Sequence, residues 1–212
     1  MSDFRDVVIS RRMVRAFRPD PVPRAQLATL VDLASRSPSA GKTQGWSAVV
    51  LEGAATARFW DATMSTETRS GFRWKFLFDA PVIMLSFADP QAYLARYAEH
   101  DKSRSRLGES LDAWPAPYWT IDASFATMTL LLAAQDAGLG ALFFGVFQGE
   151  TELRSQLGVP GHLQLIGAIA LGYERTPSPG EATDRAFGSG ASADRRRASP
   201  EDVLHYGTWG TH

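Results

Sequence analysis

The chain has 212 residues, about the length of one domain, and 44% hydrophobic with 21% charged residues is the composition of a folded globule. Its net charge of −1 provides no field that would recruit nucleic acid or an anionic membrane, although 19 of the 22 basic residues are arginine. The absence of cysteine excludes disulfides, thiol catalysis and iron–sulfur clusters. We therefore expect a single domain over residues 1–212 without a nucleic-acid partner.

Apolar spacing and prolines predict the helices and strands of the first half of the chain. A short opening helix runs into Arg11, and Pro23 stands where a second helix can begin, over Arg24–Ser35. A loop of small residues follows, and then a strand over Trp46–Leu51 and a helix over Ala54–Thr68.

The second half contains the elements that we expect at the centre of the fold. Pro81–Ala88 is almost continuously apolar, which predicts a strand buried on both faces. A helix over Gln91–Glu99 comes next, and Trp119–Ala137 is predicted as the longest helix, apolar nearly all round and hence central. Two further strands are predicted, over Phe143–Phe147 and Leu163–Leu171.

Two segments lack this periodicity. Residues 101–119 form a long polar and then aromatic loop, and a loop of this length in a compact domain is commonly a lid or a functional loop. From Arg175 to Ser199 the chain is mostly Gly, Ser, Ala, Pro and Arg, but apolar residues return between Val203 and Trp209. We therefore interpret residues 175–212 as an extended arm whose apolar end packs against a protein surface, rather than as a disordered tail.

No apolar run reaches the ~18 residues that a membrane span needs, and charges occupy the N-terminal positions where a signal peptide is apolar. We expect a cytoplasmic protein without a membrane partner.

The sequence does not match several known catalytic and nucleotide-binding motifs. Gly41-Lys42-Thr43 is not the end of a P-loop, because Arg36 stands where that motif needs glycine and the order of helix and strand is reversed. The glycines at 138, 140 and 145 do not form a dinucleotide fingerprint. The four histidines show no metal-ligand spacing, and no nucleophilic serine motif is present, so we expect no metal site. Either this is a binding protein or a cofactor carries the chemistry.

Two arginine clusters lie at opposite ends of the chain. Arg11, Arg12 and Arg15 follow the opening helix, and Arg195–Arg197 lie near the C-terminus. One interpretation is two solvated basic faces, and the other is one anionic site closed by both ends, because arginine binds phosphate bidentately. In an extended segment the first and third arginine of the second cluster would face the ligand together.

Four segments in register resemble the FMN-dependent nitroreductase family. They are Arg11–Phe17, Ser37–Trp46, Gly138–Gly145 and Arg195–Trp209, and together they extend over essentially the whole chain. The resemblance implies an α+β fold with a central, mostly antiparallel sheet flanked by helices. It further implies an extended C-terminal arm exchanged in a homodimer, with the flavins at the subunit interface.

The resemblance also implies a set of FMN-binding residues. Met13 stands where family members often carry serine, and Lys42 where asparagine is frequent, so contacts at these positions are expected to differ. The implied residues are, for the phosphate and ribityl chain, Arg11, Arg12, Met13, Arg195 and Arg197; for the N1/C2-carbonyl edge of the ring, Arg15; for the ribityl and ring edge, Pro38, Ser39, Ala40, Gly41 and Gln44; and for the border of the isoalloxazine, Phe143, Phe144 and Gly145.

The activity implied is a ping-pong transfer of electrons from NAD(P)H through FMN to flat acceptors such as nitroaromatics or quinones. No residue is expected as an obligatory acid or base, and Arg15 would tune the flavin electrostatically. Trp114 and Tyr118 are candidate substrate contacts, with ordinary packing as the alternative. Rival functions are other flavin chemistry on the same scaffold, either fragmentation of flavin to a lower ligand or reductive dehalogenation, and flavin binding without turnover.

Overall fold

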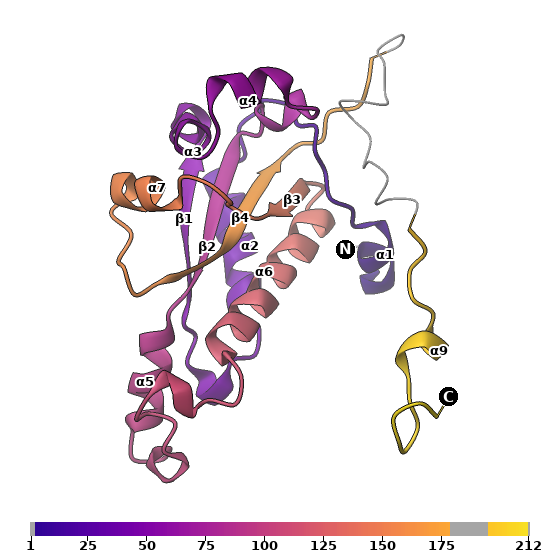
Figure 1. Ribbon diagram of the computed structural model, residues 1–212. Helices are drawn as coiled ribbons and strands as arrows, with labels where there is room; N and C mark the ends of the chain where they lie inside the picture. Colours follow the sequence, from indigo (N-terminus) through magenta and orange to yellow (C-terminus); the bar gives the residue numbers. More distant parts are fainter. Residues whose placement is uncertain (1–2, 179–194, 212) are drawn as a thin grey trace.

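A computed structural model describes residues 3–178 and 195–211. In this part of the chain four strands form one antiparallel sheet in the order β1-β2-β4-β3, flanked by helices (Figure 1). The expected α+β fold with an antiparallel sheet is therefore confirmed. The strands are β1 (Trp46–Glu52), β2 (Val82–Ala88), β3 (Gly140–Phe144) and β4 (Gln164–Gly172).

Helices cover both faces of the sheet (Figure 1). α2 (Arg24–Ser35) and α6 (Tyr118–Asp136) pack on one face, in one apolar core with alternate residues of β2 and β4. α3 (Thr56–Thr63) and α7 (Glu150–Leu157) contribute to a second core on the other face. Every residue of β2 is buried, as its continuous apolar sequence predicts.

The remaining helices lie at the ends of the sheet or outside it. α4 lies over the upper ends of the strands in Figure 1, and α5 extends from their lower ends. The bounds are α1 (Phe4–Ser10), α4 (Thr66–Gly71), α5 (Pro90–Ala98) and α9 (Pro200–Val203), with 3₁₀ turns η1 (Ala40–Lys42), η2 (Gly53–Ala55), η3 (Lys75–Leu77), η4 (Ser103–Ser105) and η5 (Leu111–Ala113).

The strand register defines two ends of the sheet. At the lower end of Figure 1, Trp46 of β1 pairs with Ala88 of β2, which pairs with Gln164 of β4. At the upper end, Leu171 of β4 pairs with Ala141 of β3. A strand rises ~3.3 Å per residue, so the stretch of β4 between Gln164 and Leu171 is roughly 20 Å long.

The segment after α1 is fixed to the upper end of the sheet. Met13 forms a parallel bridge with Ala141, and the Val14 amide donates to the Ala141 carbonyl at 2.9 Å. Farther on, Phe17 bridges Glu174. Backbone hydrogen bonds therefore hold the first arginine cluster beside β3.

Two predicted elements have wrong bounds. The helix predicted over Ala54–Thr68 is interrupted, because Met64 is extended and the Ser65 hydroxyl caps a new helix by accepting from the Thr68 amide at 3.2 Å. The strand predicted over Phe143–Phe147 instead spans Gly140–Phe144. It begins at a glycine because Val14 packs 2.9 Å from the place where a Cβ would stand.

None of the helices in residues 3–178 and 195–211 combines the length and hydropathy required to cross a bilayer. The predicted arm lies partly in residues 179–194, outside the described part of the chain.

Candidate functional site

A cavity of about 440 Å³ opens at the upper end of the sheet, between α3, α4 and the end of β3. Arg15 lines it together with Phe143, Phe144 and Gly145. These are the one residue predicted for the N1 edge of the flavin and the three predicted to border its ring. The structure thus brings four of the predicted site residues into one aromatic cavity.

The opposite wall of this cavity is formed by residues that were not predicted from the sequence. Trp60, Phe72 and Trp74 line it from α3 and from the segment after α4. Trp60 stacks parallel to Phe144 with ring centroids 6.0 Å apart, and Phe72 meets Trp74 edge-on at 5.7 Å. The clustering of aromatic residues after position 58 is the available signal, but sequence alone does not separate cavity walls from core.

Arg15 places a partly buried cation at this cavity. Its guanidinium lies 5.0 Å from the centroid of the Trp74 ring and donates from Nη1 to the Met13 carbonyl at 3.1 Å. Burial lowers the pKa of Arg15, and the neighbouring charge of Arg73 lowers it further. Arginine still remains protonated near neutral pH. A positive charge in this setting acts more strongly on a bound group than it would in water.

A second hollow, of about 160 Å³, adjoins the first and shares Arg15 with it. Arg12, Met13, Glu174 and Arg175 also line it. Arg12 is not free for a ligand, because its Nη2 pairs with the Glu174 carboxylate at 2.5 Å. A phosphate at this hollow must therefore compete with, or displace, that carboxylate.

Arg11 carries a hydrogen-bond donor that no described residue uses. Its Nη1 is buried and has no hydrogen-bond partner among the described residues. Buried donors are normally satisfied, so an orphaned guanidinium nitrogen next to further arginines fits an anionic ligand.

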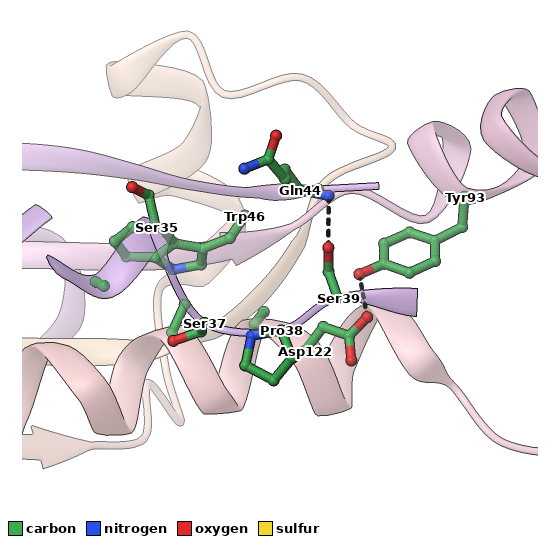
Figure 2. A pocket seen from close by; sticks show the side chains of 12 residues that line it. Ser35, Ser37, Pro38, Ser39, Gln44, Trp46, Tyr93 and Asp122 are labelled. Carbon is green, nitrogen blue, oxygen red and sulfur yellow. Dashed lines mark hydrogen bonds between the residues drawn. The ribbon is translucent and has the colours of Figure 1, made fainter. Parts of the chain in front are cut away.

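The loop Pro38–Gln44 lies just before β1 in the chain and therefore at the lower end of the sheet, where β1 begins. Figure 2 shows its residues Pro38, Ser39 and Gln44 from close by. It contains three left-handed residues, Gly41 (φ +62°), Lys42 (+56°) and Gln44 (+57°). Such a conformation costs about 1–2 kcal/mol for a non-glycine residue. The Ser39 hydroxyl closes the loop by accepting from the Gln44 amide at 3.0 Å. Backbone strain of this kind clusters at functional sites.

One chain does not bring the two groups of predicted residues together. Met13 lies beside Ala141 at the upper end of the sheet, whereas Gln44 precedes Trp46 at the lower end. The two ends are roughly 20 Å apart along the strands. The loop therefore does not reach the cavity of its own chain.

The candidate substrate contacts also lie at the lower end. Trp114 is only 8% exposed and packs against Tyr97, with ring centroids 4.6 Å apart. Its indole N–H donates to the Leu107 carbonyl at 2.9 Å. The structure thus places Trp114 in an aromatic core, whereas Tyr118 is 37% exposed.

The second arginine cluster lies on the exposed C-terminal segment. Arg196 pairs with Asp202 at 3.1 Å. Neither Arg195 nor Arg197 lines the two hollows. Among the described residues, no group of three or more His, Asp or Glu side chains could hold a metal ion.

The comparisons with known proteins agree with the fold. The family model described as "Nitroreductase family" matches residues 8–173, and the chain belongs to this family. The chain is 28% identical over 185 residues to an NADH dehydrogenase of Thermus thermophilus, which covers 81% of this chain and 86% of that protein. It is 27% identical to the nitroreductase NfnB of Mycolicibacterium smegmatis, over 79% of this chain and 81% of that protein.

A solved structure from Exiguobacterium sibiricum, described as a nitroreductase in complex with FMN, has the same fold. The TM-score is 0.57 at 17% identity, with 84% of this chain and 92% of that chain covered.

Proposed function

We propose that the protein is an FMN-dependent oxidoreductase that passes electrons from NAD(P)H to flat acceptors such as nitroaromatics or quinones. The observation that carries the proposal is the aromatic cavity with Arg15 at its edge. Arg11, four residues earlier in the chain, has a buried guanidinium nitrogen without a hydrogen-bond partner among the described residues. The names of the relatives, an NADH dehydrogenase and a nitroreductase, and the FMN complex of a protein of the same fold support the proposal.

The residues at the upper end fit FMN chemically. The cavity of about 440 Å³ is within the usual size of a ligand pocket and has aromatic walls suited to a flat ring. Arg11 supplies an unmet donor for the phosphate, and the adjoining hollow, lined by Arg12 and Met13, suits the ribityl chain and phosphate. Arg195 and Arg197, on the C-terminal segment, would add further contacts with the phosphate.

Bound FMN would supply two-electron transfer in a ping-pong cycle between NAD(P)H and the acceptor. Arg15 holds a fixed positive charge at the edge of the cavity, where it would favour the negative charge of a reduced ring. The aromatic walls would exclude water from a ring bound in the cavity. The described residues offer no general acid or base at the cavity, so we assign none.

We further propose that the site is shared by two copies of the chain. The outward face of α6 carries an apolar stripe formed by Tyr118, Ile121, Phe125, Met128 and Leu132, whose spacing of three and four residues places them on one face of the helix. Phe125 is 48% exposed and Met128 is 41% exposed. A second copy would cover this stripe.

A homodimer also explains the separated site residues. Within one chain, the Pro38–Gln44 loop and the first arginine cluster are roughly 20 Å apart. In a dimer, the loop of one subunit would instead lie beside the arginines of the other. Tyr118, near the same loop, would then lie at the partner's acceptor site. The C-terminal segment exposes Tyr206 and Trp209, as expected for an arm that packs on another copy.

An anaerobic spectrum tests the proposed activity. The purified protein, loaded with FMN, is mixed with NADH or NADPH without oxygen, and the flavin absorbance is followed. We expect rapid bleaching and recovery of the yellow colour when a nitroarene or quinone is added. Bound flavin that does not bleach with either donor would instead favour flavin binding without turnover. Slow bleaching with permanent loss of colour under oxygen would favour flavin fragmentation.

A further inference from the structure

A buried carboxylate lies beneath the strained loop. Asp122, in the first part of α6, is 7% exposed. Its Oδ2 accepts two hydrogen bonds, from the Tyr93 hydroxyl at 2.7 Å and from the Ala40 amide at 2.8 Å. Figure 2 shows Tyr93 of α5 pointing at Asp122, with Ser39 beside them. A buried carboxylate is stable only when it accepts such hydrogen bonds. The contacts of Asp122 with Tyr93 and Ala40 therefore fix how the loop lies against α5 and α6.

These contacts anchor the part of the loop that is most distorted. Ala40 opens η1, and the next two residues, Gly41 and Lys42, are left-handed. Arg96 of α5 donates from Nε to the Gly41 carbonyl at 2.9 Å. Two oppositely charged side chains from two helices therefore hold the loop on both sides of the peptide that joins Ala40 to Gly41, the Ala40 N–H by Asp122 and the Gly41 C=O by Arg96.

We infer that Asp122 is a positioning residue that fixes the path of the Pro38–Gln44 loop and so presents its backbone to the flavin. This inference rests on the proposed function. Asp122 acts through Ala40 and does not itself touch the cofactor, because it is buried under the loop.

A carboxylate suits this role better than an amide would. Both donors converge on one oxygen, and a charged acceptor strengthens each hydrogen bond. Burial and the adjacent Asp122 raise the pKa of Tyr93, so its hydroxyl remains a neutral donor at physiological pH. An asparagine can place its amide oxygen at the same point, but this neutral oxygen accepts both hydrogen bonds more weakly than the carboxylate does, and its NH₂ group then takes the place of Oδ1 in a buried setting.

The stripe on the outward face of α6 includes Ile121, the residue next to Asp122. The same helix would thus carry both the contact with the second copy and the anchor of the loop that serves the flavin of that copy.

The test compares Asp122→Asn with a control of equal burial. Thr56 is also 7% exposed, and its hydroxyl donates one hydrogen bond to the Gly53 carbonyl. It does not line either hollow or the pocket beside the Pro38–Gln44 loop. FMN affinity, the visible spectrum of bound flavin and the melting temperature are measured for each homodimer. We expect Asp122→Asn to weaken FMN binding roughly tenfold and to shift the flavin band, as loss of a charged hydrogen bond at the loop implies. Thr56→Val is expected to bind FMN like the wild type.

Tyr93→Phe separates positioning from general stability. This variant loses a buried hydrogen bond but keeps the bond between Asp122 and the loop, so we expect FMN affinity within about threefold of wild type. If affinity instead falls in proportion to melting temperature in all three variants, the positioning role is overturned.

Ala40→Pro is measured if Asp122→Asn does not fold. It removes the same N–H from the loop side, at the first position of a 3₁₀ turn, where proline is tolerated. A tenfold loss of FMN affinity supports the inference. A folded Asp122→Asn or Ala40→Pro dimer with wild-type affinity and spectrum overturns it alone, whereas wild-type protein that does not bind FMN overturns the proposed function as well.

Discussion

Replacing Arg15 by alanine is expected to slow the reduction of bound flavin by NAD(P)H about 100-fold, the usual loss when one preorganised electrostatic partner is removed. The effect is large because the guanidinium is partly buried over Trp74, where its charge is poorly screened. FMN binding is expected to weaken much less, because the phosphate contacts are proposed for Arg11, Arg195 and Arg197 and not for Arg15. Stopped-flow absorbance at saturating donor measures the reduction rate directly.

Arg18→Ala is the matched control for this experiment. Arg18 stands three residues farther on, pairs with Asp20 at 3.4 Å and lies 5.3 Å from the Tyr173 ring, but it lines neither hollow. Its replacement is expected to leave the rate unchanged. An Arg15→Ala protein that is reduced as fast as wild type would remove Arg15 from its assigned role.

The double variant Phe125→Glu/Met128→Glu is expected to dissociate the proposed dimer and to lose the FMN that we propose it binds. Both residues lie on the outward stripe of α6, and an interface there would bury unpaired carboxylates against those of the second copy. We expect the dimer dissociation constant to rise by at least about 100-fold. Sedimentation velocity gives the oligomeric state, and the flavin absorbance gives the FMN content of the same sample.

Val50→Glu serves as the control for this variant, because Val50 is 39% exposed but lies on β1, away from the stripe. It is expected to remain dimeric and yellow. A double variant of α6 that stays dimeric with full FMN would refute the interface.

The sequence predicted the parts of the fold that depend on local pattern. The continuous apolar run of β2 correctly indicated a strand buried on both faces, and the apolar character of α6 indicated a central helix. The break between α3 and α4 was missed because one capping hydroxyl, that of Ser65, decides it. The mostly polar helix α7 was missed because it buries a single residue, Leu153.

The site was predictable where residues are close in sequence to a recognisable segment. Arg15, Phe143 and Gly145 were predicted to lie at one site, and they line one cavity. Trp60 and Asp122 were not predicted, because their roles arise from contacts between distant elements. Whether the Pro38–Gln44 loop serves its own chain or another also depends on the strand register, which no local pattern reveals.

The most direct test of a flavin site assembled from two copies uses mixed dimers. Arg11→Ala removes the side chain proposed to bind the phosphate. Gly41→Val damages the loop, because that position has φ +62° and an added Cβ meets the Tyr97 ring at 2.9 Å. Each variant is expected to bind FMN poorly as a homodimer. The two chains are coexpressed with different tags, and the mixed dimer is isolated.

If each site combines the arginines of one chain with the loop of the other, the mixed dimer has one intact site and one doubly damaged site. We then expect about half of the wild-type FMN content and half of its NAD(P)H-dependent reduction of a nitroarene. A mixed dimer that recovers neither FMN nor activity would show that both halves act within one chain, which would contradict this account of the site.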